Sequence, residues 1–195
     1  ELFLQQIHKA THEQTEVVCG FMTKYFSASY LKIAEQYFEI VEQSRAWKKT
    51  RLLVLKQPKT NITHRKLINE INWKCTLHQY YGVFSSGKVD IGTQFLLEHL
   101  QVKTDELNVL DVASGNGVLA YEVVQQNPKA KVTLVDDFNL AIASSQLNLK
   151  GKSANFICAD ALDDLVQNSF DLVVSNPPFH FEHENNIEVA LNLFK

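Results

Sequence analysis

The sequence has few cysteines and no long apolar run. Cys19, Cys75 and Cys158 are odd in number, lie far apart and form no C-x-x-C pair. Such usage favours a reducing compartment over a disulfide scaffold, and we expect all three to be buried thiols. No apolar stretch approaches the roughly 20 residues that a membrane-spanning helix needs. The sequence therefore predicts a cytoplasmic protein without a membrane partner.

The charge of the chain is unevenly distributed. The whole sequence carries a net charge of −3, which on its own argues against a nucleic-acid partner. Between Arg45 and Lys74, however, nine basic residues stand against one acidic residue, Glu70. A basic segment on an acidic body can mark a phosphate-binding surface, although a solvated helix end and loop would have the same composition. The candidate nucleic-acid contacts are Lys48, Lys49, Arg51, Arg65 and Lys66.

The first 60 residues predict a small α/β unit without a ligand-binding turn. We expect the tail of a helix over residues 1–10, a strand over 15–22, a helix from the N-cap Ser27 to about Lys48, and a strand over 51–55. Residues 57–72, which are polar and basic and include Pro58, predict a linker. No glycine-rich turn joins these elements, so nothing in them could cradle a phosphate or a nucleoside.

The residues from Leu107 onward alternate between strand and helix patterns. Strands are predicted over 107–112, 131–135, 154–158 and 170–175, with helices over 118–126 and 139–149. This order predicts an α/β fold with a doubly wound, mostly parallel sheet and helices on both faces. In such folds ligands bind at the carboxyl ends of the strands.

Acidic residues stand at the ends of three of these strands. The first strand ends in the turn Asp111-Val112-Ala113-Ser114-Gly115-Asn116-Gly117, which lets a ligand approach the backbone closely. The second ends at Asp136, a candidate acceptor for ribose hydroxyls, and the third at Asp160-Ala161, which could bind an adenine. Acidic residues at the strand ends, with no cluster of basic residues in the turns, suit S-adenosylmethionine, because this molecule has no phosphate to neutralise. The glycine spacing alone would also permit a dinucleotide, because that fingerprint tolerates Ala120.

The fourth strand runs into the tetrad Asn176-Pro177-Pro178-Phe179. The apolar run Leu172–Val174 predicts a strand covered on both faces, and the two prolines end it. The Asn176 side-chain oxygen and the Pro177 carbonyl could then accept hydrogen bonds from one planar –NH2 group, while Phe179 offers a ring for stacking. These residues indicate methyl transfer to an amine, catalysed by positioning and electrostatics.

The tetrad leaves several substrates open. Its –NH2 partner could belong to guanine, to the N6 amine of adenine in DNA or RNA, or to a glutamine side chain of a protein. A catalytically inactive RNA-binding or assembly module is a further alternative, whereas the basic segment favours a structured nucleic acid over a protein tail. His180 and His183 are three residues apart, but no third ligand lies nearby, so no metal is expected.

With these motifs, the chain resembles the bacterial ribosomal RNA guanine-N2 methyltransferases, in which a degenerate methyltransferase-like domain precedes a working one. The segments that carry the likeness are GVFSSGKVDIGTQFLL (82–97), DVASGNG (111–117), LVDDFNLAI (134–142), FICADAL (156–162) and FDLVVSNPPFH (170–180). Residues 1–60 resemble part of the non-catalytic domain more loosely. The large-subunit enzymes match better than the small-subunit ones.

The resemblance implies a Rossmann-like class I methyltransferase that uses S-adenosylmethionine to methylate the N2 amine of a guanine in ribosomal RNA. It divides the chain into a partial non-catalytic domain (1–60), a linker and lead-in segment (61–80) and a catalytic domain (81–195). A complete fold of this class has three more strands, so we expect a fragment or the ordered part of a longer chain.

The resemblance also assigns roles to the site residues. It implies that Asp111, Gly115 and Gly117 line the methionine side of the cofactor, with Ala113 in place of the motif's first glycine. The added methyl group of Ala113 could crowd the turn or lower cofactor affinity. The other implied roles are ribose binding by Asp136, adenine binding by Asp160 and Ala161, guanine binding by Asn176, Pro177, Pro178 and Phe179, and closure of the cleft by Phe84, Asp90 and Thr93.

Overall fold

The structure, a computed structural model, describes residues 2–163, 165–177, 180–181 and 184–185. It divides into two compact units, Glu1–Lys66 and Leu67–Lys195, which are described separately below. Pro178 and Phe179 of the predicted tetrad lie outside the described residues. No helix in the described part of the chain is both long and apolar enough to cross a bilayer.

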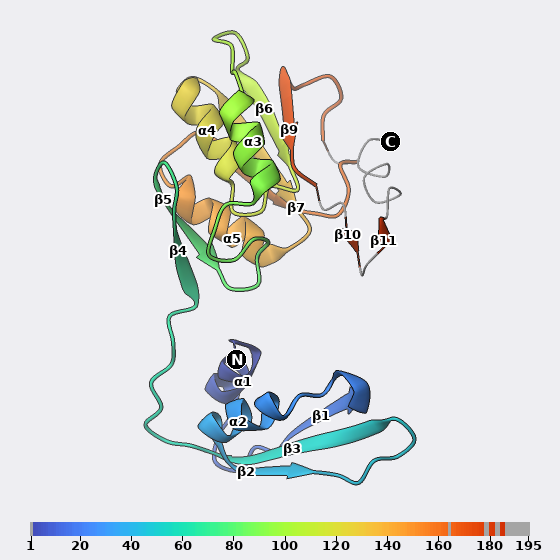
Figure 1. The fold of residues 1–195 in the computed structure, drawn as a ribbon. Helices are drawn as coiled ribbons and strands as arrows, with labels where there is room; N and C mark the ends of the chain where they lie inside the picture. Colours follow the sequence, from blue (N-terminus) through green and yellow to red (C-terminus); the bar gives the residue numbers. More distant parts are fainter. Residues whose placement is uncertain (1, 164, 178–179, 182–183, 186–195) are drawn as a thin grey trace. The chain divides into compact units, whose positions relative to one another are not determined.

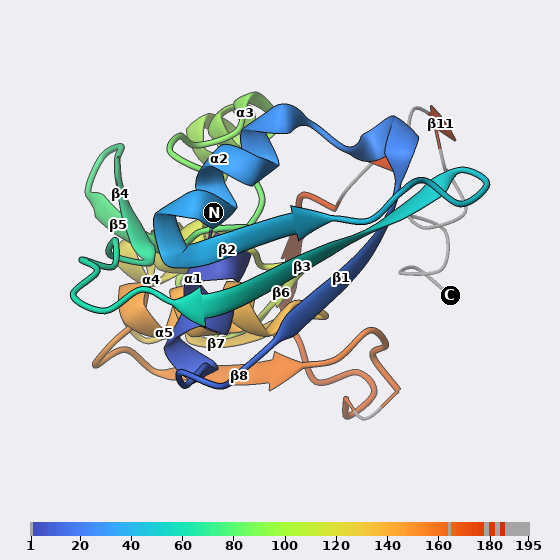
Figure 2. The ribbon, with the colours of Figure 1, turned by 90° about the horizontal axis from the view of Figure 1, so that it is seen from below.

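The first unit packs two helices against one face of a three-stranded antiparallel sheet (Figure 1). Its elements are α1 (Leu2–Ala10), β1 (Val17–Met22), the 3-10 helix η1 (Thr23–Tyr25), α2 (Ala28–Tyr37), β2 (Phe38–Gln43) and β3 (Thr50–Pro58). The strand order is β1-β3-β2, and Figure 2 shows β3 between its two neighbours. Leu53 and Leu55 of β3 are buried against Ala34 and Tyr37 of α2, so this unit has a core of its own.

The helix predicted from Ser27 to about Lys48 is correct at its start and wrong at its end. The Ser27 side chain caps α2 by accepting a hydrogen bond from the Ser29 backbone, but the helix ends at Tyr37. Residues Phe38–Gln43 form β2 instead, in register with β3 through pairs such as Val41 and Leu55. The apolar spacing up to Val41 fits a helix, and only pairing with a strand more than ten residues away decides against it.

The predicted linker over residues 57–72 is also partly wrong. The strand β3 continues to Pro58, and β4 (Ile68–Asn72) forms an antiparallel hairpin with β5 (Thr76–Tyr80). The hairpin is fixed to α5 (Asn139–Asn148), because the Asn148 side chain bonds both the N–H and the carbonyl of His78, at 2.7 and 2.9 Å. It therefore belongs to the second unit rather than to a connecting segment.

The second unit is built on a parallel sheet whose strand order is β8-β7-β6-β9. The strands are β6 (Asn108–Val112), β7 (Lys131–Asp136), β8 (Ala154–Cys158) and β9 (Leu172–Ser175), and its other helices are α3 (Ile91–His99) and α4 (Val118–Gln126). The short strands β10 (His180–Phe181) and β11 (Glu184–Asn185) pair after the tetrad. This arrangement confirms the predicted Rossmann-like α/β fold of class I methyltransferases.

Hydrogen bonds at the start of β9 fix its register against β6. The Asp171 carboxylate accepts from the N–H groups of Leu107 and Asn108 at 2.9 and 2.8 Å. These hydrogen bonds favour the ionised form and lower the pKa of Asp171. The clamp aligns the two strands so that their carboxyl ends reach the same edge of the sheet.

The two faces of this sheet are covered differently. Val109, Leu134 and Val174 pack beneath the helices α4 and α5, but Leu110, Val112 and Val135 on the opposite face pack against Leu162, Leu165 and Phe170 of the irregular segment that follows β8. The expectation of helices on both faces is therefore not met within the described residues. Val173 is 52% exposed, so the prediction of a strand covered on both faces is wrong at this position.

The cysteine prediction is wrong as well. Cys19 and Cys75 are only half-buried and Cys158 is exposed, where we expected three buried thiols. Cys158 is the last residue of β8, at the edge of the sheet, and its side chain lies outside the packed core.

Candidate active site

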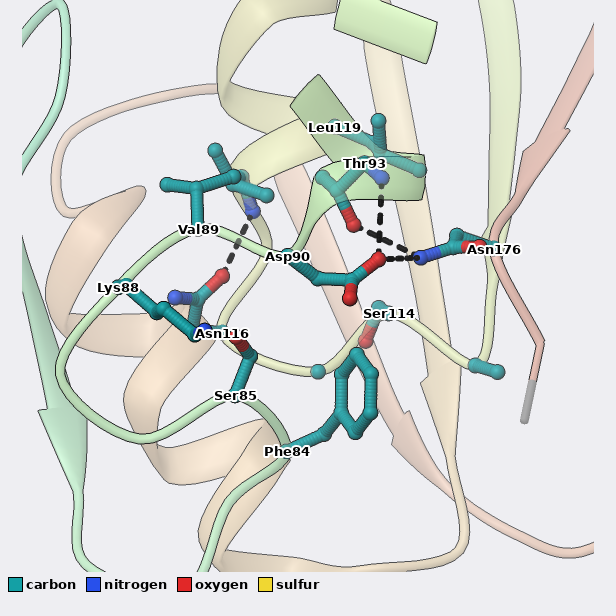
Figure 3. A pocket seen from close by; sticks show the side chains of 13 residues that line it. Phe84, Ser85, Lys88, Val89, Asp90, Thr93, Ser114, Asn116, Leu119 and Asn176 are labelled. Carbon is teal, nitrogen blue, oxygen red and sulfur yellow. Dashed lines mark hydrogen bonds between the residues drawn. The ribbon is translucent and has the colours of Figure 1, made fainter. Parts of the chain in front are cut away.

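A cavity lies where the start of α3, the glycine turn after β6 and the end of β9 meet (Figure 3). Its space measures about 430 Å³, part of which is open to solvent. Six residues singled out from the sequence line it, from four separate segments of the chain: Phe84, Asp90, Thr93, Ala113, Gly115 and Asn176. The parallel topology brings these segments together at the carboxyl edge of the sheet.

Asn176 is held in a defined orientation on the wall of this cavity. Its side-chain nitrogen donates to Thr93 Oγ1 at 2.8 Å and to Asp90 Oδ2 at 3.3 Å (Figure 3). A carboxylate oxygen only accepts, so the amide must turn its nitrogen toward Asp90. The Asn176 side-chain oxygen is thereby left to accept a hydrogen bond from another group, and Pro177 beside it is buried.

Asp90 has a second role in the local structure. The same Oδ2 atom accepts from the N–H groups of Gly92 and Thr93 and so caps the start of α3. This cap positions the start of α3 against Asn176. A Cβ atom on Gly92 would lie 3.1 Å from Asp90 Oδ2 and 3.4 Å from Asn176 Oδ1, so this approach tolerates little added bulk.

Three residues of the turn after β6 have a left-handed backbone. The φ angles are 55° at Ala113, 55° at Gly115 and 76° at Gly117. A Cβ on Gly117 would lie 3.0 Å from Ser145 Cβ and 3.1 Å from Leu134 Cδ2, whereas a Cβ on Gly115 would have no atom within 4 Å. A side chain at position 117 would therefore clash with its neighbours, whereas the space beside Gly115, which lines the cavity, is open. Ala113, where the sequence lacks a glycine, has the unfavourable conformation without glycine's freedom.

Asp136 ties the end of β7 to this turn. Its carboxylate oxygens accept from the N–H groups of Gly115 and Phe138 at 2.8 and 3.0 Å. Burial raises the pKa of Asp136, and these two hydrogen bonds oppose the rise. The carboxylate lies beside the cavity-lining turn and not among the residues that line the cavity.

Asp111 lies beneath the turn and not in the cavity. Its side chain is fully buried, and one oxygen accepts from the Ala120 N–H at 3.1 Å while the other, Oδ1, has no hydrogen-bond partner among the described residues. Burial, together with the nearby charge of Asp136, raises the pKa of Asp111 to about 7. The Ser114 hydroxyl is likewise buried without a partner. Two buried polar atoms without partners next to a cavity are unusual in a folded protein.

Asp160, Ala161 and the predicted basic residues are not among the residues that line the cavity. Asp160 and Ala161 follow β8 and are exposed. Of the basic residues, Lys48, Lys49 and Arg51 belong to the hairpin of β2 and β3, whereas Arg65 and Lys66 follow β3 at the end of the first unit. These five basic residues therefore come from two separate parts of the first unit. Within the described residues no three His, Cys, Asp or Glu side chains could hold a metal ion, and His183 and the His180 side chain lie outside that range.

Sequence reasoning missed the residues that hold the cavity wall in place. Gln79 is fully buried, and its nitrogen donates to the carbonyls of Val83 and Phe84 at 2.8 Å while its oxygen accepts from the Asn116 side chain at 2.8 Å. It joins the Phe84 loop to the glycine turn. Lys88 is the basic residue among those that line the cavity, and it was missed too. Asn116 could have been predicted from its place in the glycine turn, but no local sequence pattern predicts the role of Gln79.

Comparison with known families is consistent with this geometry. Residues 74–195 match the methyltransferase small domain family, and residues 1–60 match the RLMG N-terminal domain. The first match covers more than half of the chain, so the chain belongs to the methyltransferase small domain family.

Individual relatives confirm the resemblance to ribosomal RNA methyltransferases. Ribosomal RNA large subunit methyltransferase G of Vibrio vulnificus is 33% identical over 98% of this chain and 53% of its own length. The protein of the same name in Psychromonas ingrahamii is 30% identical over 100% of this chain and 53% of its own length. A T. thermophilus 16S rRNA N2 methyltransferase, solved with AdoMet and guanosine, superposes with a TM-score of 0.76 at 26% identity, over 92% of this chain and 51% of that one. The chain thus spans about half the length of these relatives.

Proposed function

We propose that this chain belongs to an S-adenosylmethionine-dependent enzyme that methylates the exocyclic N2 amine of a guanine in ribosomal RNA. The observation that carries the proposal is the orientation of the Asn176 amide. Its nitrogen is occupied by Thr93 and Asp90, so its oxygen is the atom left to accept from a substrate amine. An acceptor fixed in this way suits an amino group at the cavity, not a carbonyl group.

The residues around the glycine turn fit S-adenosylmethionine. This molecule supplies a methyl group on a positively charged sulfur and carries a ribose, an adenine and an amino acid. The open space at Gly115 allows close approach to the backbone, and the unpartnered Ser114 hydroxyl could bond a polar group of the ligand. We assign Ala113, Gly115 and Gly117 to the methionine side, supported from below by Asp111. Asp136 would bind the ribose, and Asp160 with Ala161 the adenine.

The tetrad would act on the guanine by holding its amine. The lone pair of an exocyclic amine is delocalised into the ring, so the nitrogen is a poor nucleophile. Two acceptors, the Asn176 oxygen and the Pro177 carbonyl, would bind its two hydrogens and favour a pyramidal nitrogen that directs its lone pair at the methyl group. Phe179 would stack on the base, and Phe84, which lines the cavity, would help to close it. The S–CH3 bond breaks as the N–CH3 bond forms, and the cationic nitrogen then releases one proton to water. Catalysis thus arises from positioning and electrostatics, and no strong base is required.

The choice of guanine in ribosomal RNA is supported by the relatives rather than by the cavity. Adenine N6 and glutamine N5 amines would satisfy the same acceptors. The relatives from Vibrio vulnificus and Psychromonas ingrahamii are named for ribosomal RNA, and the T. thermophilus enzyme is named for an N2 position. We propose ribosomal RNA, free or in a ribosomal particle, as the partner, the cytoplasm as the location, and residues 1–60 as part of a non-catalytic domain.

Two measurements test the proposal. Isothermal titration should detect binding of S-adenosylmethionine, which Asp136→Ala should weaken about tenfold by removing the ribose acceptor. Transfer of labelled methyl groups to ribosomal RNA that lacks the modification should yield N2-methylguanosine when the digested nucleosides are identified by mass. If the labelled nucleoside were N6-methyladenosine, the substrate would be adenine and the assignment to guanine would be wrong. Absence of cofactor binding would instead favour the inactive RNA-binding module.

A further inference from the structure

The tip of the hairpin between β2 and β3 displays cations and aromatic rings together. Lys48 and Lys49 form its two-residue turn, which is closed by hydrogen bonds of 3.0 Å in both directions between Trp47 and Thr50. The Lys49 carbonyl also accepts from the Thr23 N–H at 2.9 Å, which fixes η1 beside the turn. The tip is therefore a well-defined part of the first unit, in which hydrogen bonds join η1 to the turn between β2 and β3.

The side chains at this tip face solvent. Trp47 is 71% exposed and Tyr25 of η1 is 67% exposed. A lysine lies over each ring, Lys48 at 4.8 Å from the Trp47 ring centroid and Lys24 at 4.4 Å from that of Tyr25. Residues 43–51 contain four cations and no acidic residue. Two large rings left in water carry a hydrophobic penalty that a partner stacked on them would remove.

Three other basic residues of the segment are held by contacts within the first unit. Lys56 lies 3.3 Å from a Glu16 carboxylate oxygen, and Lys59 donates to the Glu35 carbonyl at 2.7 Å. The backbone around Arg65 is clamped by Gln5, whose amide both donates to the Arg65 carbonyl and accepts from its N–H. The hairpin tip is thus the part of the segment where exposed cations and exposed aromatic rings coincide.

We propose that this tip binds an unpaired stretch of RNA, with nucleobases stacked on Trp47 and Tyr25 and phosphates bound by Lys24, Arg45, Lys48 and Lys49. The four cations favour a partner with negative charge, and the exposed rings favour a partner with accessible base faces. A duplex hides its base faces, whereas a loop or bulge presents them. The inference rests on the proposed RNA substrate and deepens it, since it supplies a contact on the first unit, apart from the cavity.

The test uses the intrinsic fluorescence of the whole chain. The sequence has two tryptophans, Trp47 and Trp73, so a Trp73→Phe background reports on Trp47 alone. A mixed-sequence single-stranded RNA 12-mer should quench this emission, and a duplex of equal length should not. By fluorescence anisotropy of labelled RNA, Trp47→Ala should weaken single-strand binding about tenfold with little effect on duplex binding. Phe3→Ala is the matched control, because Phe3 is 72% exposed on α1 of the same unit.

The charge contribution is separated by salt dependence. Replacing Lys48 and Lys49 with glutamine should reduce the slope of log K against log salt by about 1.4 for single strands, while the control pair Lys9→Gln and Lys32→Gln should leave it unchanged. Equal losses for single strands and duplexes in Trp47→Ala, or full displacement of RNA by polyglutamate, would overturn the stacking assignment. These measurements need no cofactor, so they test RNA binding by the tip independently of S-adenosylmethionine binding. Either proposal can be refuted while the other is confirmed.

Discussion

Two buried polar side chains, one in each unit, are used in opposite ways. In the first, Gln5 is buried and satisfied, because its amide makes two hydrogen bonds with the backbone of Arg65. In the second, Asp111 is equally buried, yet one of its oxygens has no partner and its pKa is raised to about 7. The first arrangement fastens a chain segment, whereas the second keeps an unfavourable group beside a cavity. Such groups are retained where a ligand or a reaction uses them.

The difference follows from sheet topology. In the parallel sheet, β6, β7 and β9 all deliver their carboxyl ends to one edge, so residues more than 60 positions apart, such as Asp111 and Asn176, reach the same region. In the antiparallel sheet, strand ends alternate in direction, and the feature that results is an exposed turn between β2 and β3. One unit therefore concentrates polar groups around a cavity, and the other displays cations and rings at a tip.

The largest predicted effect is a pH dependence of the second unit. The raised pKa of Asp111 means that the folded state holds a proton which the unfolded state releases above its ordinary pKa of 3.8. Unfolding free energy should therefore fall as pH rises from about 4 to about 7, by roughly 4 kcal/mol in total. Asp111→Asn should remove most of this slope. Asp136, whose pKa is also raised, should leave a smaller residual slope of the same sign.

Urea unfolding of a Trp47→Phe variant can measure this slope, because Trp73 packs against the core of the second unit and reports on it. Asp105→Asn, at an exposed carboxylate, is the matched control and should run parallel to the unsubstituted chain. A slope that survives Asp111→Asn unchanged would show that the proton resides elsewhere.

Asn176→Ala should separate catalysis from cofactor binding. Loss of the fixed acceptor should raise the barrier to methyl transfer by about 2–4 kcal/mol, roughly 30- to 900-fold in kcat. Affinity for S-adenosylmethionine should stay nearly constant, because the Asn176 oxygen is assigned to the amine. Rates at saturating RNA and calorimetric titration of the cofactor give the two values. Equal loss of both would refute the assigned role. Thr93→Ser keeps the hydroxyl that Asn176 bonds and should have a much smaller effect.

The two glycines of the turn should differ when each is replaced by alanine. Gly117→Ala combines a left-handed φ with contacts near 3.0 Å to Ser145 and Leu134, so it should lower the unfolding free energy by about 2–3 kcal/mol. The added methyl group of Gly115→Ala would have no described atom within 4 Å, so this variant should lower the unfolding free energy by only about 1 kcal/mol, from its φ alone. The methyl group would, however, project into open space and lower the affinity for the cofactor. Urea unfolding and titration of both variants should give opposite rankings. The same ranking in both assays would contradict the distinction between packing and binding.

The sequence predicted the second unit well because its signals are local. The helix over 118–126 matches α4 in full, and the strand over 154–158 matches β8, since apolar runs bounded by turns need no distant partner to be recognised. The end of α2 and the hairpin of β4 and β5 were not predictable in this way. Both depend on pairing between strands, and the apolar spacing around Val41 is compatible with helix and strand alike.

The sequence predicted those residues of the candidate site that belong to recognisable motifs. Gly115 and Asn176 line one cavity, as expected from their positions at the sheet edge, and Asp90 and Thr93, which were named only through the resemblance, line it too. Gln79 was missed because its role exists only once β5 lies beside the glycine turn. The sequence also could not separate Asp111, beneath the turn, from residues that line the cavity, since burial of a carboxylate is decided by tertiary packing.

Ala113→Gly should give the smallest change and the opposite sign. Ala113 holds a φ of 55°, which a side chain makes unfavourable, so glycine should relieve strain at this position. The greater freedom of glycine in the unfolded chain offsets part of the gain, leaving about 0.5–1 kcal/mol of added stability. Because Ala113 also lines the cavity, cofactor affinity should rise or stay constant. Lower stability of Ala113→Gly in urea would mean that the methyl group packs favourably in the turn, and the departure from the glycine motif would then be an adaptation of this chain rather than a strain.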